Sequence, residues 1–334
     1  MIKILRSSII DFTGLIIIGL TLLLFSFSTS FNGALTFPPS VLDLNTIFLS
    51  ILIEALPFIL IGVLIAGMIQ IFVTEEHIQK WIPKNKVMAV IMSCVVGALF
   101  PACECGIVPI VRRLISKGVP IYAAIGFMLT GPLINPIVIA STYMAFGNNI
   151  KMAGLRMGLG FLIAILVALT ISFVVKGNQL KTSISIKSTH SHLHIQEKSF
   201  MSLFWSMLIH SIDEFFDMAK FLIIGAFLAA FVQTYIPAKT LLETGSGPVS
   251  SLLVMMGLAY VLSLCSEADA FIGASFSSIF PTPSILGFLI FGPMIDLKNT
   301  LMMLSVFRYK FVMGLLALVI STVFITIMLL QSFL

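Results

Sequence analysis

Long apolar blocks separated by short polar segments fill almost the whole of this 334-residue chain. The blocks cover residues 9–30, 45–73, 87–117, 119–146, 152–175, 217–236, 249–280, 283–307 and 309–331. A helix of about 20 residues, rising about 1.5 Å per residue, crosses the roughly 30 Å hydrocarbon core of a bilayer, and every block is at least that long. The sequence lacks the ten-residue alternating strands of a membrane β-barrel. The pattern predicts an all-α polytopic membrane protein.

Composition supports this class, because 59% of the residues are hydrophobic and 10% are charged. Soluble domains carry about 25% charged residues, so a soluble protein is excluded. The net charge of +5 does not indicate nucleic acid, since the basic residues gather at the ends of the blocks. The lipid bilayer is the expected partner. The first block follows Lys3 and Arg6 but has no small-residue cleavage site before Phe31, which predicts a retained anchor helix.

Two blocks, 87–117 and 249–280, are too long for one straight crossing, and each is broken near its middle. The first break covers residues 101–106 (Pro-Ala-Cys-Glu-Cys-Gly), and the second covers residues 263–269 (Ser-Leu-Cys-Ser-Glu-Ala-Asp). Hydrocarbon tolerates an interrupted helix only where its freed backbone groups are buried in protein or face a water-filled cavity. The breaks therefore indicate a site.

The two halves of the chain share motifs at a spacing of 161 to 163 residues. Residues 131–135 (Gly-Pro-Leu-Ile-Asn) return as residues 292–296 (Gly-Pro-Met-Ile-Asp), and Cys103 falls opposite Cys265. Further pairs in the same order are Glu54 with Asp217, Gly62 with Gly225, Ala66 with Ala229, and Gln70 with Gln233. This agreement predicts a duplication, and internally repeated membrane proteins are commonly transporters with the binding site between the repeats.

The distribution of Lys and Arg predicts the topology. If both broken blocks are re-entrant hairpins, 14 basic residues lie inside and 3 outside, as the positive-inside rule requires; the outside residues are Lys151, Arg156 and Lys239. The expected fold is then an inverted repeat of three spans plus a broken re-entrant hairpin, with an extra N-terminal helix. Its expected parts are an anchor helix and outside loop (1–44), the first repeat (45–176), a cytoplasmic linker with an interfacial helix (177–216) and the second repeat (217–334).

The linker carries three histidines at alternate positions, His190, His192 and His194. Such a tract could hold zinc or copper, and a solvated linker explains it equally well. Residues 200–216 have the composition of an amphipathic interfacial helix, with aromatic residues such as Trp205 opposed to acids such as Glu214.

The cysteines at the breaks are the candidate ligands. Cys103 and Cys105 flank an acid, and in an unwound turn both thiols can face one ligand, which selects copper(I), zinc or a trivalent metalloid. Cys265 occupies the matching break and could approach the same centre. The alternative is that these are small residues that allow close packing. Cys94, inside an apolar run, is expected to act as a small hydrophobic residue.

Ionisable residues inside the blocks give the strongest argument for a site. Five of them would cost about 3 kcal/mol each if they faced lipid, on the order of 15 kcal/mol in total. They must therefore face one another or water. These residues are Glu104, Glu267, Asp269, Asp296 and Lys298. Asp296 and Lys298 are expected to pair, whereas Glu104, Glu267 and Asp269 are candidates for proton exchange during transport.

The four breaks together predict a discontinuous-helix site of the kind found in carriers. The residues that break the helices are Pro101, Gly106, Gly131, Pro132, Gly292 and Pro293. The candidate substrate-binding residues are Cys103, Glu104, Cys105, Asn135, Cys265 and Asp296. For Asn135 and Asp296 a second interpretation is equally supported, namely that they cap the half-helices that follow them.

The sequence resembles the bacterial predicted-permease family that includes the organoarsenical efflux permease ArsP. The resemblance lies in residues 101–106, in residues 131–136 (Gly-Pro-Leu-Ile-Asn-Pro), and in Cys265 followed by residues 269–271 (Asp-Ala-Phe). The resemblance covers roughly residues 45–331. It implies a multi-pass permease of the bacterial plasma membrane whose cysteines bind a trivalent arsenical. It also implies that some relatives act with a second membrane protein.

Three functions are compatible with these features. The first is a secondary, proton-coupled exporter of a thiophilic solute, because the chain lacks the Walker motif of an ATP-driven pump. The second is a non-transport subunit or sensor that acts with another membrane protein. The third, a thiol-dependent membrane enzyme, is disfavoured because no histidine lies near the breaks to serve as a base. No cofactor is expected.

Overall fold

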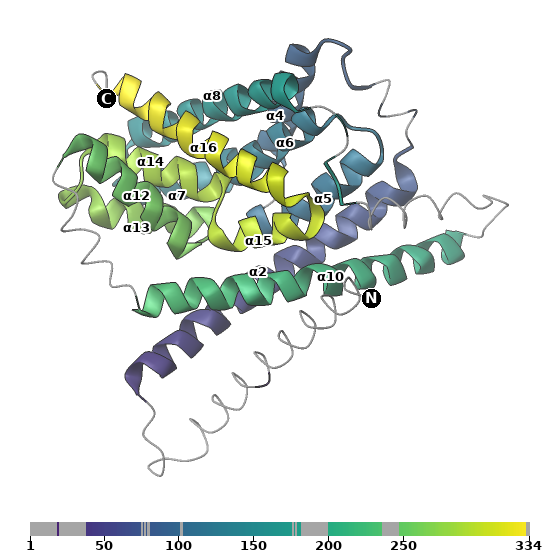
Figure 1. Cartoon of the computed structure of the whole chain (residues 1–334), viewed down its shortest axis with the longest axis horizontal. Coiled ribbons are helices and arrows are strands. Elements are labelled where there is room, and N and C mark those ends of the chain that lie inside the picture. Colours follow the sequence, from purple (N-terminus) through teal and green to yellow (C-terminus); the bar gives the residue numbers. More distant parts are fainter. Residues whose placement is uncertain are drawn as a thin grey trace.

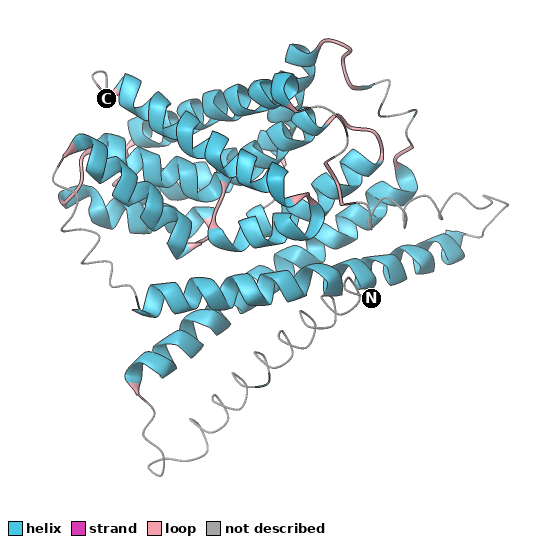
Figure 2. Cartoon of the chain, in the orientation of Figure 1, coloured by secondary structure: helices cyan, strands magenta, loops and turns pink. Residues whose placement is uncertain are grey.

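The computed structural model describes residues 38–74, 81–100, 103–175, 200–235 and 247–331, with positions 19, 76, 78, 177 and 179–181. The regular structure of these residues is helical, apart from an isolated bridge between Leu180 and Phe307 (Figure 2). The expected anchor helix, the three linker histidines and Pro101 lie outside the described residues.

The described helices follow one another along the chain as α2 (Pro39–Phe72), α4 (Lys86–Leu99), α5 (Glu104–Ser116), α6 (Ile121–Ile134), α7 (Pro136–Ala145), α8 (Ile150–Val174), α10 (Phe200–Tyr235), α12 (Pro248–Leu262), α13 (Ser266–Ser275), the short 3-10 helix η2 (Phe276–Ser278), α14 (Thr282–Met294), α15 (Leu297–Val306) and α16 (Tyr309–Leu330). Within this part of the chain, six stretches are long and apolar enough to cross a bilayer, namely Pro39–Phe72, Ile121–Ala145, Ile150–Val174, Met207–Tyr235, Thr282–Val306 and Tyr309–Leu330. The predicted class, an all-α polytopic membrane protein, is confirmed.

The order of helices repeats along the chain. The long helix α2, of 34 residues, corresponds to α10, of 36 residues. The half-helix pairs α4–α5 and α6–α7 correspond to α12–α13 and α14–α15, and α8 corresponds to α16. The duplicated motifs therefore mark equivalent positions in equivalent helices. That the second repeat is inverted remains a prediction from the charge distribution.

Local chemistry explains where the half-helices meet. Pro132 and Pro293 lie in the last turns of α6 and α14, where each removes an N–H donor from the helix. The next helix in each repeat starts with a polar side chain at its N-cap. Asn135 Oδ1 accepts from the Ile137 N–H at 3.0 Å, and Asp296 Oδ1 accepts from the Asn299 N–H at 2.5 Å.

The helices α2 and α10 pack against each other along one side of the molecule (Figure 1). In Figure 1 the end of α2 that contains Pro39 points away from the remaining helices. Close packing holds α2 to α5, because a Cβ at Gly62 would overlap the backbone of Gly106.

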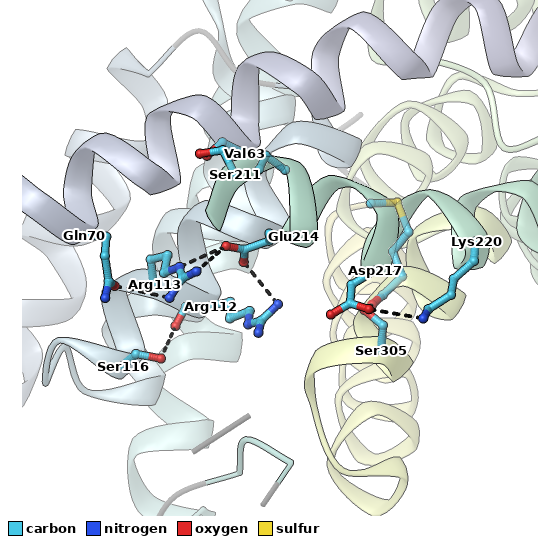
Figure 3. A network of polar contacts seen from close by, with 11 residues as sticks. Val63, Gln70, Arg112, Arg113, Ser116, Ser211, Glu214, Asp217, Lys220 and Ser305 are labelled. Atoms are coloured by element: carbon cyan, nitrogen blue, oxygen red, sulfur yellow. Dashed lines mark hydrogen bonds and ion pairs between the residues drawn. The ribbon is translucent and has the colours of Figure 1, made fainter. Parts of the chain in front are cut away.

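The structure differs from the expectation of a separate interfacial helix over residues 200–216. The helix α10 continues without a break through these positions, and Ser211 and Glu214 are buried. Glu214 Oε2 accepts from Arg113 Nε at 2.9 Å and from Arg113 Nη2 at 2.6 Å (Figure 3). Glu214 Oε1 lies 3.1 Å from Arg112 Nη1. The acid that suggested a water-facing surface instead meets two arginines of α5.

Gln70 of α2 completes this network, since its Oε1 accepts from Arg113 Nη1 at 3.2 Å (Figure 3). We call Gln70, Arg112, Arg113 and Glu214 the ion-pair network. It ties α5 to both α2 and α10.

Candidate functional site

The four half-helices that follow the breaks begin at Glu104, Pro136, Ser266 and Leu297. The residues before them, at the N-cap positions, are Cys103, Asn135, Cys265 and Asp296. Asn135 and Asp296 use their side chains to cap, as one of the two interpretations of these residues requires. The side chains of Cys103 and Cys265 make no capping hydrogen bond. Both thiols are free cysteines and partly exposed.

A buried charge cluster joins the two repeats. Lys298 Nζ of α15 lies 3.2 Å from Glu104 Oε1 of α5 and 3.5 Å from Asp296 Oδ2. The same ammonium group donates to the Ser263 carbonyl at 3.0 Å. We call Glu104, Asp296 and Lys298 the central cluster. All three are at most 4% exposed, so these charges face one another rather than lipid.

The cluster does not balance its own charge. One ammonium group faces two carboxyl groups, so a negative charge remains when both carboxyl groups are ionised. The Ser266 hydroxyl donates to Glu104 Oε2 at 3.5 Å and offsets part of this charge. A buried, uncompensated charge is costly, so additional donors and cations close to the cluster help to stabilise it.

Arg156 of α8 is a member of the site that the sequence did not reveal. It is 1% exposed, although the charge count placed it on the outer side. Its Nη1 donates to Thr142 Oγ1 of α7 at 2.6 Å, and its Nη2 donates to the Ser266 carbonyl at 3.0 Å. A cation thus reaches from α8 across α7 to the start of α13. Its position inside block 152–175 was the available signal, because an arginine within a span is expensive unless it has partners.

Asp269 lies in the first turn of α13 and is 1% exposed. Neither of its carboxyl oxygens has a hydrogen-bond partner among the described residues. The carboxyl group lies against the end of α14, because a Cβ at Gly292 would be 2.8 Å from Asp269 Oδ2. Glu267, the neighbouring candidate, is partly exposed.

The thiols form one pair and one separate contact. Cys105 is buried, and its side chain lies close enough to that of Cys103 to interact with it, so the two thiols are neighbours. The side chain of Cys265 lies close enough to the carboxyl group of Glu54 on α2 to interact with it. In the described part of the chain, no three His, Cys, Asp or Glu side chains gather as a metal site would require. Two adjacent thiols suit a ligand that accepts two sulfur atoms.

The remaining candidates act through packing. Gly106 lies under α2, since a Cβ there would be 2.7 Å from the Phe58 carbonyl oxygen. Gly131 leaves room for the side chain of Ile107, and Gly292 leaves room for Asp269. Cys94 is fully buried and its sulfur faces Gly126, in line with a packing role.

The model of the predicted permease family ArsP_1 matches residues 40–332. The chain belongs to this family. The resemblance inferred from the breaks is therefore confirmed, and the chain is a multi-pass bacterial membrane protein.

Two relatives match most of the chain. The UPF0718 protein YcgR of Bacillus subtilis is 50% identical over 289 residues, which are 86% of this chain and 97% of that protein. A protein of Streptococcus mutans named "Putative two-component membrane permease complex subunit" is 45% identical over 276 residues, which are 83% of this chain and 91% of that protein. The UPF0718 protein MJ0584 of Methanocaldococcus jannaschii is 26% identical over 145 residues, 43% of this chain and 39% of that protein. No solved structure matches the chain significantly.

For this family member, the structure brings together some predicted site residues and separates others. Glu104 and Asp296 meet at Lys298, and Cys103 meets Cys105. Asn135 serves as a cap, and Cys265 contacts Glu54 instead of the other thiols. The site is therefore a dithiol beside a charge cluster, with a third acid, Asp269, in the first turn of α13.

Proposed function

We propose that this chain is a secondary carrier that exports a thiophilic solute, in exchange for protons, by exposing the site between its repeats to one side of the membrane at a time. The observation that carries the proposal is the unequal covering of equivalent half-helices. In a duplicated carrier, such inequality is the mark of one state of a two-state cycle.

The long helices α2 and α10 pack against only two of the four half-helices that follow the breaks. Among the described residues, α2 packs closely on α5 and α10 packs closely on α15, whereas the equivalent pairs α10–α13 and α2–α7 share few contacts. Ile110 of α5 is 1% exposed, but Ile272, its equivalent on α13, is 36% exposed. The repeats have similar sequences at these points, so their difference in burial reflects the position of α2 and α10.

Contacts of two equivalent glycines show the same difference between the repeats. Gly62 of α2 lies against Gly106 of α5. Its equivalent, Gly225 of α10, lies against Lys298 of α15 instead of Ala268, the residue that corresponds to Gly106. If the repeats exchanged conformations, α10 would cover α13 and α2 would cover α7.

The charge distribution supports one orientation of this state in the membrane. Basic residues at the ends of α5 and at the start of α16, such as Arg113 and Arg308, indicate that α5 and α15 occupy the cytoplasmic half. The state described here is then closed towards the cytoplasm, and the ion-pair network seals it. The α7–α13 half, uncovered by α2 and α10, would face outside.

The dithiol supports a trivalent organoarsenical or a soft metal ion as the solute. A trivalent arsenic atom with two hydroxyl groups can exchange both for the sulfur atoms of Cys103 and Cys105, which releases two water molecules as each S–H proton joins a hydroxyl. The reverse exchange releases the solute. The adjacent thiols suit two-sulfur ligation better than a cage of three or four ligands.

Survival of a sensitive bacterial host tests the proposal. Cells expressing the wild type, the double variant C103S/C105S or the control C94S are challenged with trivalent organoarsenicals, arsenite, copper, zinc and cadmium, and intracellular solute is measured. We expect protection and low accumulation with the wild type and C94S, and loss of both with the double variant. Equal protection by all three well-expressed proteins would exclude the cysteines as ligands.

A second candidate function is a subunit that works only with another membrane protein. The printed name of the Streptococcus mutans relative favours it. Solute flux by the purified chain alone in proteoliposomes would exclude this function, and flux only after addition of a second membrane protein would support it.

A further inference from the structure

Three intramembrane carboxyl groups, Glu104, Glu267 and Asp269, are candidates for the coupling proton, and their environments differ. Glu104 has an ammonium partner, Lys298, and a hydroxyl donor, Ser266. Glu267 is partly exposed. Asp269 is buried and has no hydrogen-bond donor among the described residues. A buried carboxylate without a donor is strongly disfavoured, whereas a protonated carboxyl group is tolerated.

From this we propose that Asp269 is the group that carries the coupling proton, and that Arg156 stabilises it when the proton leaves. This inference rests on the proposed carrier function and names the residue that couples it. The reaction is a simple proton transfer: the Asp269 O–H bond breaks, the proton passes to water on the open side, and the carboxylate remains.

Two influences favour the neutral form of Asp269. The carboxyl group lies against the end of α14, where a Cβ on Gly292 would be 2.8 Å from its Oδ2. Helix C-terminal ends are electronegative because their last carbonyls have no intrahelical partner, so a second negative charge there is unfavourable. Complete burial acts in the same direction.

Two other influences favour the ionised form. Asp269 lies in the first turn of α13, where the helix dipole stabilises an acid. Arg156 lies within electrostatic range of Asp269, although its hydrogen bonds go to Thr142 and to the Ser266 carbonyl. The opposition of these influences suits a group that must gain and lose a proton in each cycle.

The other charged groups near Asp269 belong to the central cluster. Glu104 and Asp296 oppose its ionisation, and Lys298 favours it. The elements packed directly on α13 are α7, η2 and α14, and their sequences contain no Asp, Glu, Lys, Arg or His. Tyr143 of α7 is their titratable side chain. Arg156 is therefore the nearby cation outside the central cluster, and a substitution can remove it while Glu104, Asp296 and Lys298 stay in place.

Labelling with dicyclohexylcarbodiimide tests protonation without any solute. This apolar reagent adds to protonated carboxyl groups in apolar surroundings, and mass spectrometry locates the adduct. In the purified full chain we expect an adduct on Asp269 that declines as pH rises, and a decline displaced to higher pH in R156Q. Adducts on Glu104 or Glu267 in place of Asp269 would overturn the proposal. Protection of Asp269 by sodium at fixed pH, relative to choline, would also overturn it in favour of a sodium site.

Transport by proteoliposomes provides the second readout. D269N keeps the shape of the protonated acid, so we expect it to retain solute exchange between the two faces while losing uphill transport driven by a pH gradient. D217N, at a partly exposed acid of α10 that pairs with Lys220, is the matched control and should retain both activities. Uphill transport by D269N equal to wild type would overturn the proposal. If the wild type itself moves no solute, the carrier function fails, while the labelling result still tests Asp269.

Discussion

The ion-pair network offers a direct test of the two-state interpretation, through the substitution E214Q. Glu214 is the acid that faces both Arg112 and Arg113, and none of the three side chains is more than 14% exposed. Glutamine keeps the size of the side chain and removes its charge. Two adjacent guanidinium groups then lose their shared acid in a closed interface, whereas in a state open to the cytoplasm water would solvate them.

The magnitude follows from the burial of the pair. Removing one partner of a buried ion pair costs about 3–5 kcal/mol. Because Glu214 has two partners and the closed state alone contains the network, at least about 3 kcal/mol should act against that state. A difference of about 1.4 kcal/mol is a tenfold change, so the ratio of closed to open molecules should fall roughly 100-fold.

The native cysteines at the site provide the assay. A membrane-impermeant maleimide is applied to right-side-out and inside-out vesicles, and mass spectrometry measures modification of Cys103, which is partly exposed. We expect wild-type Cys103 to react from the outside and E214Q Cys103 to react from the cytoplasmic side. D213N, at the exposed neighbouring acid, is the control and should behave as wild type. Identical sidedness in E214Q and wild type, with both proteins folded, would refute the reasoning.

Two further predictions concern stability, measured by thermal unfolding in detergent. In G62A the new Cβ would overlap backbone atoms of Gly106, which cannot turn aside, so we expect the free energy of unfolding to fall by about 1–3 kcal/mol. The control G257A should change little, because nothing lies within 4 Å of a Cβ at that position. An unchanged stability of G62A would contradict the close α2–α5 contact. In K298M, Glu104 and Asp296 lose their ammonium partner, so we expect the free energy of unfolding to fall by about 3–5 kcal/mol. The control K220M removes a more exposed pair, the one with Asp217, and should lower the free energy of unfolding by less than about 1 kcal/mol. Equal losses in the two lysine variants would show that the central cluster does not stabilise the fold.

Local signals in the sequence predicted the helix breaks and the repeated order of the helices. Proline and glycine act on their own backbone, so residues 131–135 and 292–296 could be interpreted without any tertiary contact. The cost of charge in hydrocarbon likewise predicted that Asp296 and Lys298 meet, because they lie two residues apart. Both conclusions depend on near neighbours in the chain.

The sequence did not predict the environment of side chains whose partners lie on a helix distant in the chain. Glu214 resembled a residue of a water-facing helix surface, because nothing in its own segment shows that two arginines of α5 lie opposite. Arg156 was assigned to the outer side because charge counting treats a residue near a helix start as part of the loop. In both cases the missing information was which helices pack together, and the packing of α10 on α2 and of α8 beside α7 supplies it.

If the two repeats exchange conformations during transport, a contact between α10 and α13 that is absent from this state should form. Gly225 and Ala268 are the equivalents of Gly62 and Gly106, but Gly225 lies against Lys298 here. In the opposite state the backbones of α10 and α13 should approach as closely as those of α2 and α5. The double variant G225C/A268C should then form a disulfide under mild oxidation, since close backbones fall within the Cα separation of about 4.4–6.8 Å that disulfides require.

The yield of that disulfide should depend on the state of the cycle. We expect little cross-linking in the G225C/A268C protein itself and much more when E214Q is added, because E214Q weakens the closed state. The control pair G225C/G314C should not cross-link in either background, because a Cβ at Gly314 has nothing within 4 Å. Mass spectrometry distinguishes these disulfides from those of the native cysteines. Absence of the engineered α10–α13 disulfide from G225C/A268C in both backgrounds would mean that α10 does not move onto α13, and that the unequal covering of the repeats is a fixed feature of the fold.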